Sequence, residues 1–140
     1  MIFLSLFLII IFFVLGIIHL NWVFGGDFGF DKSLPTKENG ERVLNPKKME
    51  SAVVGIVLIV FGVFYGVKSE LIVFQIDDQL LVYGAYIIPA IFILRAIGEF
   101  KYVGFFKRIK NTEFGKLDTR FFSPLCLTIG VIGLLVQILS

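Results

Sequence analysis

Cysteine and histidine are almost absent from the sequence, which contains one of each. A single cysteine excludes an internal disulfide framework and any zinc site built from clustered cysteines. A single histidine excludes the two-histidine spacings of metal-binding helices, and the sequence has no glycine-rich phosphate loop of the P-loop or Rossmann kind. We therefore expect no metal site, no cofactor and no catalytic motif of a known type.

Charged residues are also scarce, at 17% of the chain, whereas hydrophobic residues reach 57%. A soluble domain of average composition is about one quarter charged. The net charge of +2 gives no strong attraction to nucleic acid. The length of 140 residues allows one domain at most, and the mean hydropathy of +0.92 favours a membrane protein.

The apolar residues are gathered into four long runs, which we interpret as membrane spans. The expected spans are residues 2–24, 52–67, 79–100 and 122–139. Because unpaired backbone polar groups are costly in lipid, each of these runs must be a helix. The first run has no basic leader region and no cleavage site, so we expect a retained helix. The sequence predicts an all-α, polytopic membrane protein whose one domain, residues 1–140, is a four-helix bundle.

The connections between the spans differ sharply in charge. The long loops 25–49 and 101–121 together carry eleven Lys and Arg residues, whereas the short loop 68–78 carries only Lys68. With four spans, both long loops lie on one side of the membrane and both termini on the other. The positive-inside rule predicts cytoplasmic long loops and outside termini in the cell membrane. The expected partner is the lipid bilayer, with anionic headgroups near the basic loops.

Segment 100–121 mixes aromatic and basic residues. Tyr102, Phe105, Phe106 and Ile109 have the spacing of one helix face, which favours a short helix lying on the membrane surface. The alternative is that the basic residues only set the orientation of the spans, and that the segment continues the third helix out of the membrane.

A GxxxG pair, Gly62 and Gly66, lies in the second span and permits close helix contact. We expect plain packing within the bundle. The alternative is a contact with a second copy of the chain or with a partner membrane protein.

Three chemically able side chains lie at one expected depth near the cytoplasmic face. At about 1.5 Å per residue, His19 and Arg95 lie roughly 7 Å inside their spans and Cys126 roughly 6 Å inside its span. Charged side chains within spans usually face a bundle interior or a wet cavity, so Arg95 is the strongest pointer to a site. The spacing of Glu99 from Arg95 predicts an i,i+4 ion pair, and Trp22 shares one helix face with His19.

Each of these residues also has a plainer interpretation. Arg95 reaches the interface and pairs only with Glu99, His19 is a hydrogen-bonding strut, and Cys126 is a small buried apolar residue.

The fourth span is expected to begin with Ser123 as N-cap and Pro124 as the first helical residue. Free N–H groups at such a helix start attract anions, and Arg95 and Arg120 would complete an anion site there. The same dipole would activate the thiol of Cys126 where water reaches it.

Two stretches of the chain form a pattern. HLNWVFGG, residues 19–26, and LRAIGEFKYVGFFKRIKNTEFGKLDTRFFSPLCL, residues 94–127, make up about a third of the sequence. They resemble a bacterial family of small four-span membrane proteins, domain of unknown function 3995. The matching positions are His19, Trp22, Arg95, Gly98, Glu99, Phe100, Phe114, Asp118, Thr119, Ser123, Pro124, Leu125 and Cys126. The resemblance implies a bacterial multi-pass protein and no particular activity.

We expect a binding or transport-type protein with a cytoplasm-facing polar pocket for a small anion or a lipid headgroup. The candidate ligand-binding residues are His19, Trp22, Arg95, Glu99, Asp118, Arg120, Ser123 and Cys126. One alternative is a structural or regulatory membrane subunit. The other is a small membrane enzyme with His19 as base and Cys126 or Asp118 as its partner.

Overall fold

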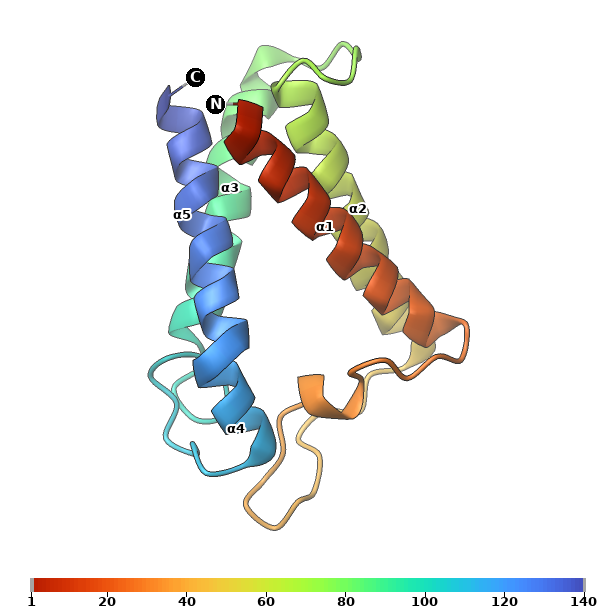
Figure 1. The fold of residues 1–140 in the computed structure, drawn as a ribbon, viewed down its shortest axis with the longest axis vertical. Helices are drawn as coiled ribbons and strands as arrows, with labels where there is room; N and C mark the ends of the chain where they lie inside the picture. The colour runs from red at the N-terminus through yellow and green to blue at the C-terminus, as the bar shows by residue number, and fades with distance from the viewer. Residues whose placement is uncertain (1, 140) are drawn as a thin grey trace.

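The computed structural model describes residues 2–139, which form helices joined by irregular loops (Figure 1). The first three long helices are α1 (Ile2–Val23), α2 (Lys48–Lys68) and α3 (Asp78–Ile97). The last is α4 (Glu113–Leu117), which continues through the π-helical turn η2 (Asp118–Phe122) into α5 (Ser123–Leu139). A short 3-10 helix, η1 (Asp31–Ser33), lies in the first long loop. Residues 2–139 contain no β-strand, so the all-α prediction is confirmed.

Four helices are long and apolar enough to cross a membrane: α1, α2, α3 and the continuous helix Glu113–Leu139. Their outer surfaces carry large apolar side chains that nothing within residues 2–139 covers; Ile17 is 62% exposed and Ile138 is 69% exposed. A water-soluble monomer rarely exposes apolar surface on this scale. The predicted four-span membrane bundle is therefore confirmed.

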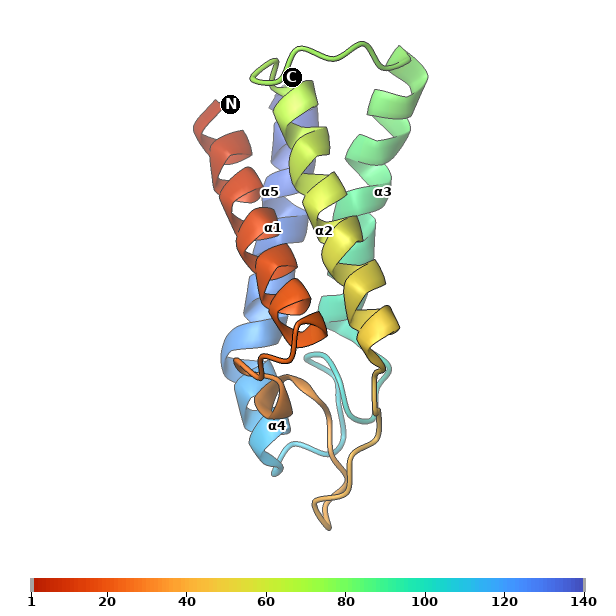
Figure 2. The same cartoon turned by 90° about the vertical axis from the view of Figure 1, so that its right-hand side faces the viewer.

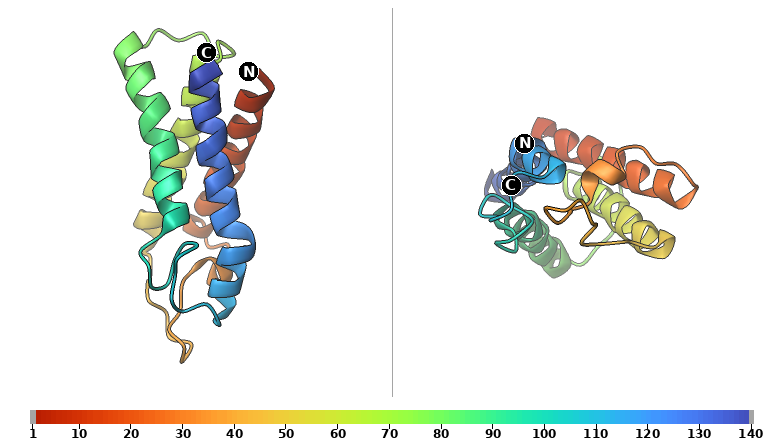
Figure 3. Two further views of the ribbon diagram at one scale, coloured as in Figure 1. Left: turned by 90° about the vertical axis from the view of Figure 1, so that its left-hand side faces the viewer. Right: turned by 90° about the horizontal axis from the view of Figure 1, so that it is seen from below.

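The helices associate as two antiparallel pairs, α1 with α2 and α3 with α5 (Figures 1 and 2). Both termini and the short loop 69–77 lie at one end of the bundle (Figure 1). The long loops 24–47 and 98–112 lie at the other end (Figures 1 and 3). The two pairs meet near the start of α1 and diverge toward the long loops, where α1 and α5 are far apart in Figure 1.

The shared core lies in the half of the bundle nearer the termini, and Phe12 is at its centre. Phe12 is fully buried, and its ring centroid lies 5.4 Å from that of Phe92 on α3 and 5.9 Å from that of Tyr65 on α2. Ile129 and Val136 of α5 complete the cluster. One aromatic ring thus joins the two helix pairs, and close packing of this kind resists changes in side-chain volume.

Glycines set the close contact between α1 and α2. A Cβ atom on Gly16 would lie 3.0 Å from the carbonyl oxygen of Gly55, so the two backbones nearly touch. A Cβ atom on Gly62 would lie 3.3 Å from Cβ of Phe12, whereas one on Gly66 would lie 2.5 Å from Cδ1 of Ile72 in the short loop 69–77. The GxxxG pair therefore packs against the chain itself, through two different neighbours.

Three helix boundaries differ from the expected ones. α2 begins at Lys48, before the apolar run, because the Glu50 side chain accepts a hydrogen bond from the backbone N–H of Lys47 at 3.3 Å and caps the first turn. α3 ends at Ile97 because Gly98 has a φ of +86°, in the left-handed region. The last helix begins at Glu113, well before residue 122, because Thr112 caps it.

Candidate functional site

The start of the last helix differs from the sequence prediction. Thr112 is its N-cap, and the Thr112 hydroxyl accepts a hydrogen bond from the N–H of Gly115 at 2.9 Å. Ser123 has the helical angles φ −68° and ψ −43° and lies within the helix, so its expected capping role is wrong. The N-terminus of the last helix therefore lies at Thr112, eleven residues before Ser123 and not beside Cys126.

The reason is the π-helical turn η2. Pro124 has no N–H and cannot make the usual hydrogen bond to a carbonyl four residues earlier. The chain widens there, and the N–H of Ser123 donates to the carbonyl of Asp118, five residues earlier. Such a turn absorbs the proline inside a helix and is frequent at functional sites. It also makes Asp118 the first residue of a distorted segment.

Asp118 is the centre of a buried polar cluster. Its side chain is fully buried and accepts hydrogen bonds from Nη2 of Arg95 at 2.8 Å and from the backbone N–H of Gly104 at 2.7 Å. The Nζ atom of Lys107 lies 3.3 Å from the second carboxylate oxygen. One carboxylate thus joins the end of α3, the loop 98–112 and the start of the last membrane helix.

Lys107 is the residue that sequence reasoning missed. Its side chain is fully buried, and its ammonium donates to the carbonyl of Gly104 at 3.0 Å and to the hydroxyl of Thr119. In the sequence it is one of several lysines in a basic loop, and the positive-inside rule treats all of them in the same way. No local pattern marks it, because its burial depends on where Asp118 lies.

The loop 98–112 is closed by two glycines that lie against each other. Gly98 and Gly104 have φ values of +86° and +93°. A Cβ atom on Gly98 would lie 1.8 Å from the carbonyl oxygen of Val103, and one on Gly104 would lie 2.3 Å from that of Ile97. Only glycine fits this contact. The N–H of Gly104 therefore reaches the Asp118 carboxylate.

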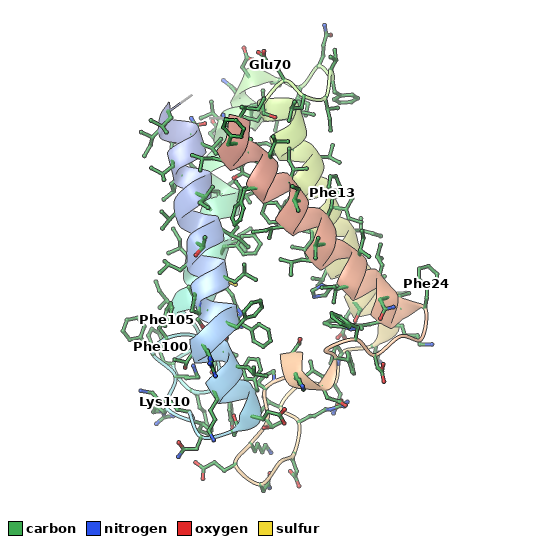
Figure 4. The ribbon with its side chains drawn as sticks, viewed as in Figure 1. Phe13, Phe24, Glu70, Phe100, Phe105 and Lys110 are labelled. Atoms are coloured by element: carbon green, nitrogen blue, oxygen red, sulfur yellow. The ribbon has the colours of Figure 1, made fainter. Side chains whose placement is uncertain are left out.

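The same loop is irregular from Gly98 to Thr112, so both expected forms of this segment, a surface helix and a continuation of α3, are wrong. The tight turns that bury Lys107 take the place of a regular helix. Figure 4 labels Phe100, Phe105 and Lys110 in this loop, beside the lower part of the last helix. Phe100 has a φ of +71°, which is unusual for a large side chain.

Glu99 does not pair with Arg95, and the expected i,i+4 ion pair is wrong because α3 ends between the two residues. The Glu99 carboxylate instead accepts hydrogen bonds from the backbone N–H groups of Lys101 and Val103 at 3.0 Å, and from that of Tyr102. Slight desolvation of this exposed carboxylate would raise the pKa of Glu99, but the hydrogen bonds outweigh it and hold the pKa below its usual value.

The polar cluster keeps an excess of positive charge. Two cations, Arg95 and Lys107, surround one carboxylate. The Nη1 atom of Arg95 is buried and has no hydrogen-bond partner among residues 2–139, and the same holds for the buried hydroxyl of Ser123. Buried polar atoms normally have partners, so each unpaired atom requires an explanation.

His19 and Trp22 form a separate group at the end of α1. The Nδ1–H of His19 donates to the carbonyl of Leu15 at 2.8 Å, and its ring centroid lies 4.6 Å from that of Trp22. The indole N–H of Trp22 donates to the carbonyl of Phe28 at 2.7 Å and fixes the following loop. Within residues 2–139, no hydrogen bond, ion pair or ring contact joins this group to Arg95.

The remaining candidates lie on the last helix. Cys126 is partly buried and packs against the hydrophobic core. Arg120 is exposed. The structure therefore joins Arg95 to Asp118, places Cys126 further along the same helix as Asp118, and leaves His19 on the other helix pair.

A cavity of about 280 Å³ lies outside the polar cluster, where the first long loop covers the start of α4. Asp31, Lys37 and Glu113 are among its lining residues, so it carries charges of both signs. Leu34 of the first long loop and Phe114 of α4 are buried beside it. The cavity lies between the first long loop and the start of α4, and none of its lining residues belongs to the Asp118 cluster.

Four apolar helices with a buried ionic cluster at one end define a multi-pass integral membrane protein. The chain belongs to the family described as protein of unknown function (DUF3995), whose profile matches residues 12–133. The matched region includes the His19–Trp22 pair and the whole Asp118 cluster. No curated protein and no solved structure matches the chain.

Proposed function

We propose that this membrane protein binds a phosphate group through Arg95, at the end of the bundle that carries the long basic loops. The observation behind the proposal is the buried, unpartnered Nη1 atom of Arg95 in a cluster with one more cation than anion. A guanidinium carries five donors in a fixed fork, which suits phosphate oxygens. The phosphate belongs either to a lipid headgroup or to a small free anion.

The access of Arg95 supports this function. Its side chain as a whole is 32% exposed, although its Nη1 atom is itself buried, whereas the side chains of Lys107 and Asp118 are fully buried. Asp118 holds the Nη2 edge, so the guanidinium is fixed in orientation before any ligand arrives. A preorganised donor loses less freedom on binding than a mobile one. Asp118 and Lys107 act as positioning residues in this scheme, and Arg95 alone touches the ligand.

The expected topology agrees with a phosphate ligand. The two basic loops lie at one end of the bundle, which the positive-inside rule assigns to the cytoplasm (Figure 1). Lysines and arginines there raise the local concentration of anionic headgroups and soluble phosphates. Fusing a reporter enzyme to the C-terminus tests this orientation. The reporter should be active only on the outer side of the cytoplasmic membrane. Reporter activity in the cytoplasm would contradict the predicted orientation.

The binding test uses purified full-length protein. Native mass spectrometry in the presence of phosphatidylglycerol or phosphatidylcholine measures lipid retention, and thermal melts in phosphate or chloride buffer measure binding of the free anion. Arg95→Gln should weaken phosphate binding about tenfold or more, because hydrogen bonds to charged groups are among the stronger ones. Arg120→Gln removes the same charge from an exposed position and should bind like the wild type.

The two arms identify the source of the phosphate. Selective retention of phosphatidylglycerol without stabilisation by inorganic phosphate indicates a lipid headgroup, and the converse indicates a soluble anion. The proposal would be contradicted if a folded Arg95→Gln variant bound phosphatidylglycerol and inorganic phosphate as well as the wild type does.

The alternatives of a membrane subunit and an enzyme have less support from the geometry. Gly62 and Gly66 pack against Phe12 and Ile72 of the chain itself, so a partner protein would need another surface. His19 and Cys126 lie on different helix pairs, and the His19 Nδ1 is engaged with the carbonyl of Leu15.

A further inference from the structure

A second cavity lies at the opposite end of the bundle, beside the short loop 69–77. Its volume is about 880 Å³, which is large enough for a small organic molecule. Residues from the end of α2, the loop and the start of α3 line it: Val67, Glu70, Ile72, Val73, Phe74, Gln75, Ile76, Asp77, Asp78 and Leu81. We call this feature the outer groove.

Specific contacts fix the walls of the outer groove. Glu70 has a φ of +65°, which turns the chain back at the end of α2. The N–H of Ile72 then donates to the carbonyl of Gly66 at 3.0 Å, and its side chain lies over that glycine. On the other side Asp77 caps α3 by accepting from the N–H of Gln79 at 3.1 Å. Both ends of the loop are thus held by the helices that it joins.

The outer groove combines apolar surface with negative charge. Val73 is 97% exposed and Phe74 is 68% exposed, beside the lipid-facing surfaces of α2 and α3. Three carboxylates, those of Glu70, Asp77 and Asp78, line the same groove, and none of them forms an ion pair within residues 2–139. No basic residue lines it. Its surface is complementary to a molecule that is both hydrophobic and positively charged.

We propose that the outer groove binds a hydrophobic organic cation, an ammonium or phosphonium centre that carries apolar substituents. The apolar substituents would lie against Phe74 and its neighbours, and the charge would face the three carboxylates. An anionic or zwitterionic phospholipid is disfavoured, since its phosphate would face the same carboxylates. The groove is at the other end of the bundle from Arg95, so this inference is independent of the proposed phosphate site (Figure 1).

The test uses tetraphenylphosphonium and tetraphenylborate, which have nearly the same size and opposite charge. Equilibrium dialysis measures the binding of each to the full-length protein in a neutral detergent. We expect saturable binding of the phosphonium and none of the borate. The triple variant Glu70→Gln/Asp77→Asn/Asp78→Asn should bind the phosphonium on the order of tenfold more weakly, as three partly exposed ionic contacts predict.

The variants separate charge from folding. Asparagine at position 77 is itself a good helix cap, so the triple variant should keep its melting temperature. The matched control Asp27→Asn/Glu38→Gln/Glu41→Gln removes three exposed carboxylates at the opposite end and should bind like the wild type.

Three outcomes would overturn the proposal. They are the absence of saturable phosphonium binding, equal binding of the borate, and unchanged phosphonium binding in the folded triple variant. Displacement of the phosphonium by phosphatidylethanolamine or phosphatidylglycerol would likewise assign the groove to a phospholipid and refute it. None of these results depends on whether Arg95 binds phosphate.

Discussion

Replacing Asp118 with asparagine should destabilise the protein more than any other single change of charge. Asparagine has a similar size and its oxygen can still accept from the N–H of Gly104, so shape is nearly preserved. The negative charge is lost, however, and Arg95 and Lys107 would remain without their shared anion. Breaking a buried ion pair from one side typically costs about 3–5 kcal/mol because a buried charge is left uncompensated.

The structure shows how that cost is divided. Arg95 is 32% exposed and can turn toward the interface, so it recovers part of its hydration. Lys107 is fully buried, and its remaining partners, the carbonyl of Gly104 and the hydroxyl of Thr119, are neutral. Most of the penalty should therefore come from Lys107. Lys107→Met alone should cost less, about 1–2 kcal/mol, since Asp118 keeps Arg95 and Gly104 as partners.

A double-mutant cycle checks this reasoning. Unfolding of the wild type, the two single variants and Asp118→Asn/Lys107→Met is followed in mixed micelles by titration with a denaturing detergent. The double variant should be more stable than Asp118→Asn, with a coupling energy of about 1–3 kcal/mol between the two positions. A loss below about 1 kcal/mol for Asp118→Asn, or additive effects of the two changes, would refute a buried charge cluster.

Three further predictions concern two glycine contacts and the carboxylate of Glu99. Gly98→Ala or Gly104→Ala should lower the free energy of unfolding by more than about 2 kcal/mol in the same assay, because each Cβ atom would overlap a carbonyl. The control is Gly40→Ala, where φ is +89° but the surrounding space is open. This variant should lose only about 1 kcal/mol. Gly16→Leu should separate α1 from α2 and cost about 1–3 kcal/mol, and an unchanged unfolding midpoint would contradict that contact. The folded-state pKa of Glu99 is lowered, so its stabilising effect is present above the pKa of the unfolded carboxyl and is lost as the pH falls through the folded-state value. Glu99→Gln should flatten this acid-side change in melting temperature, and identical pH profiles for the two proteins would show that the carboxylate does not hold the loop.

The sequence predicted the four helices because each apolar run has the length that a bilayer demands, and this requirement does not depend on tertiary contacts. It also placed His19, Arg95 and Cys126 at one depth, since depth along a membrane helix follows from residue number alone. Depth does not say which helices are neighbours, and the structure places His19 on the other helix pair. The ion pair predicted for Arg95 was wrong because a glycine two residues before the expected end of the span terminates α3.

The start of the last helix shows a different limit. Ser123 and Pro124 match the sequence pattern of a helix start, but Thr112 followed by Glu113 is an equally good start. Local preference does not decide between them. The buried contacts of Asp118 with Arg95 and Lys107 favour the longer helix, and the π-helical turn accommodates Pro124 within it. Burial of Lys107 is likewise a tertiary effect that no spacing rule detects.

The buried cluster has a consequence for how the chain enters a membrane. Arg95, Lys107 and Asp118 all belong to the second helix pair and are close in the sequence. A charge that enters lipid without a partner is costly. Here the counter-ion of Arg95 belongs to the next helix in the chain, so the second helical hairpin carries its own charge partner and needs none from the first.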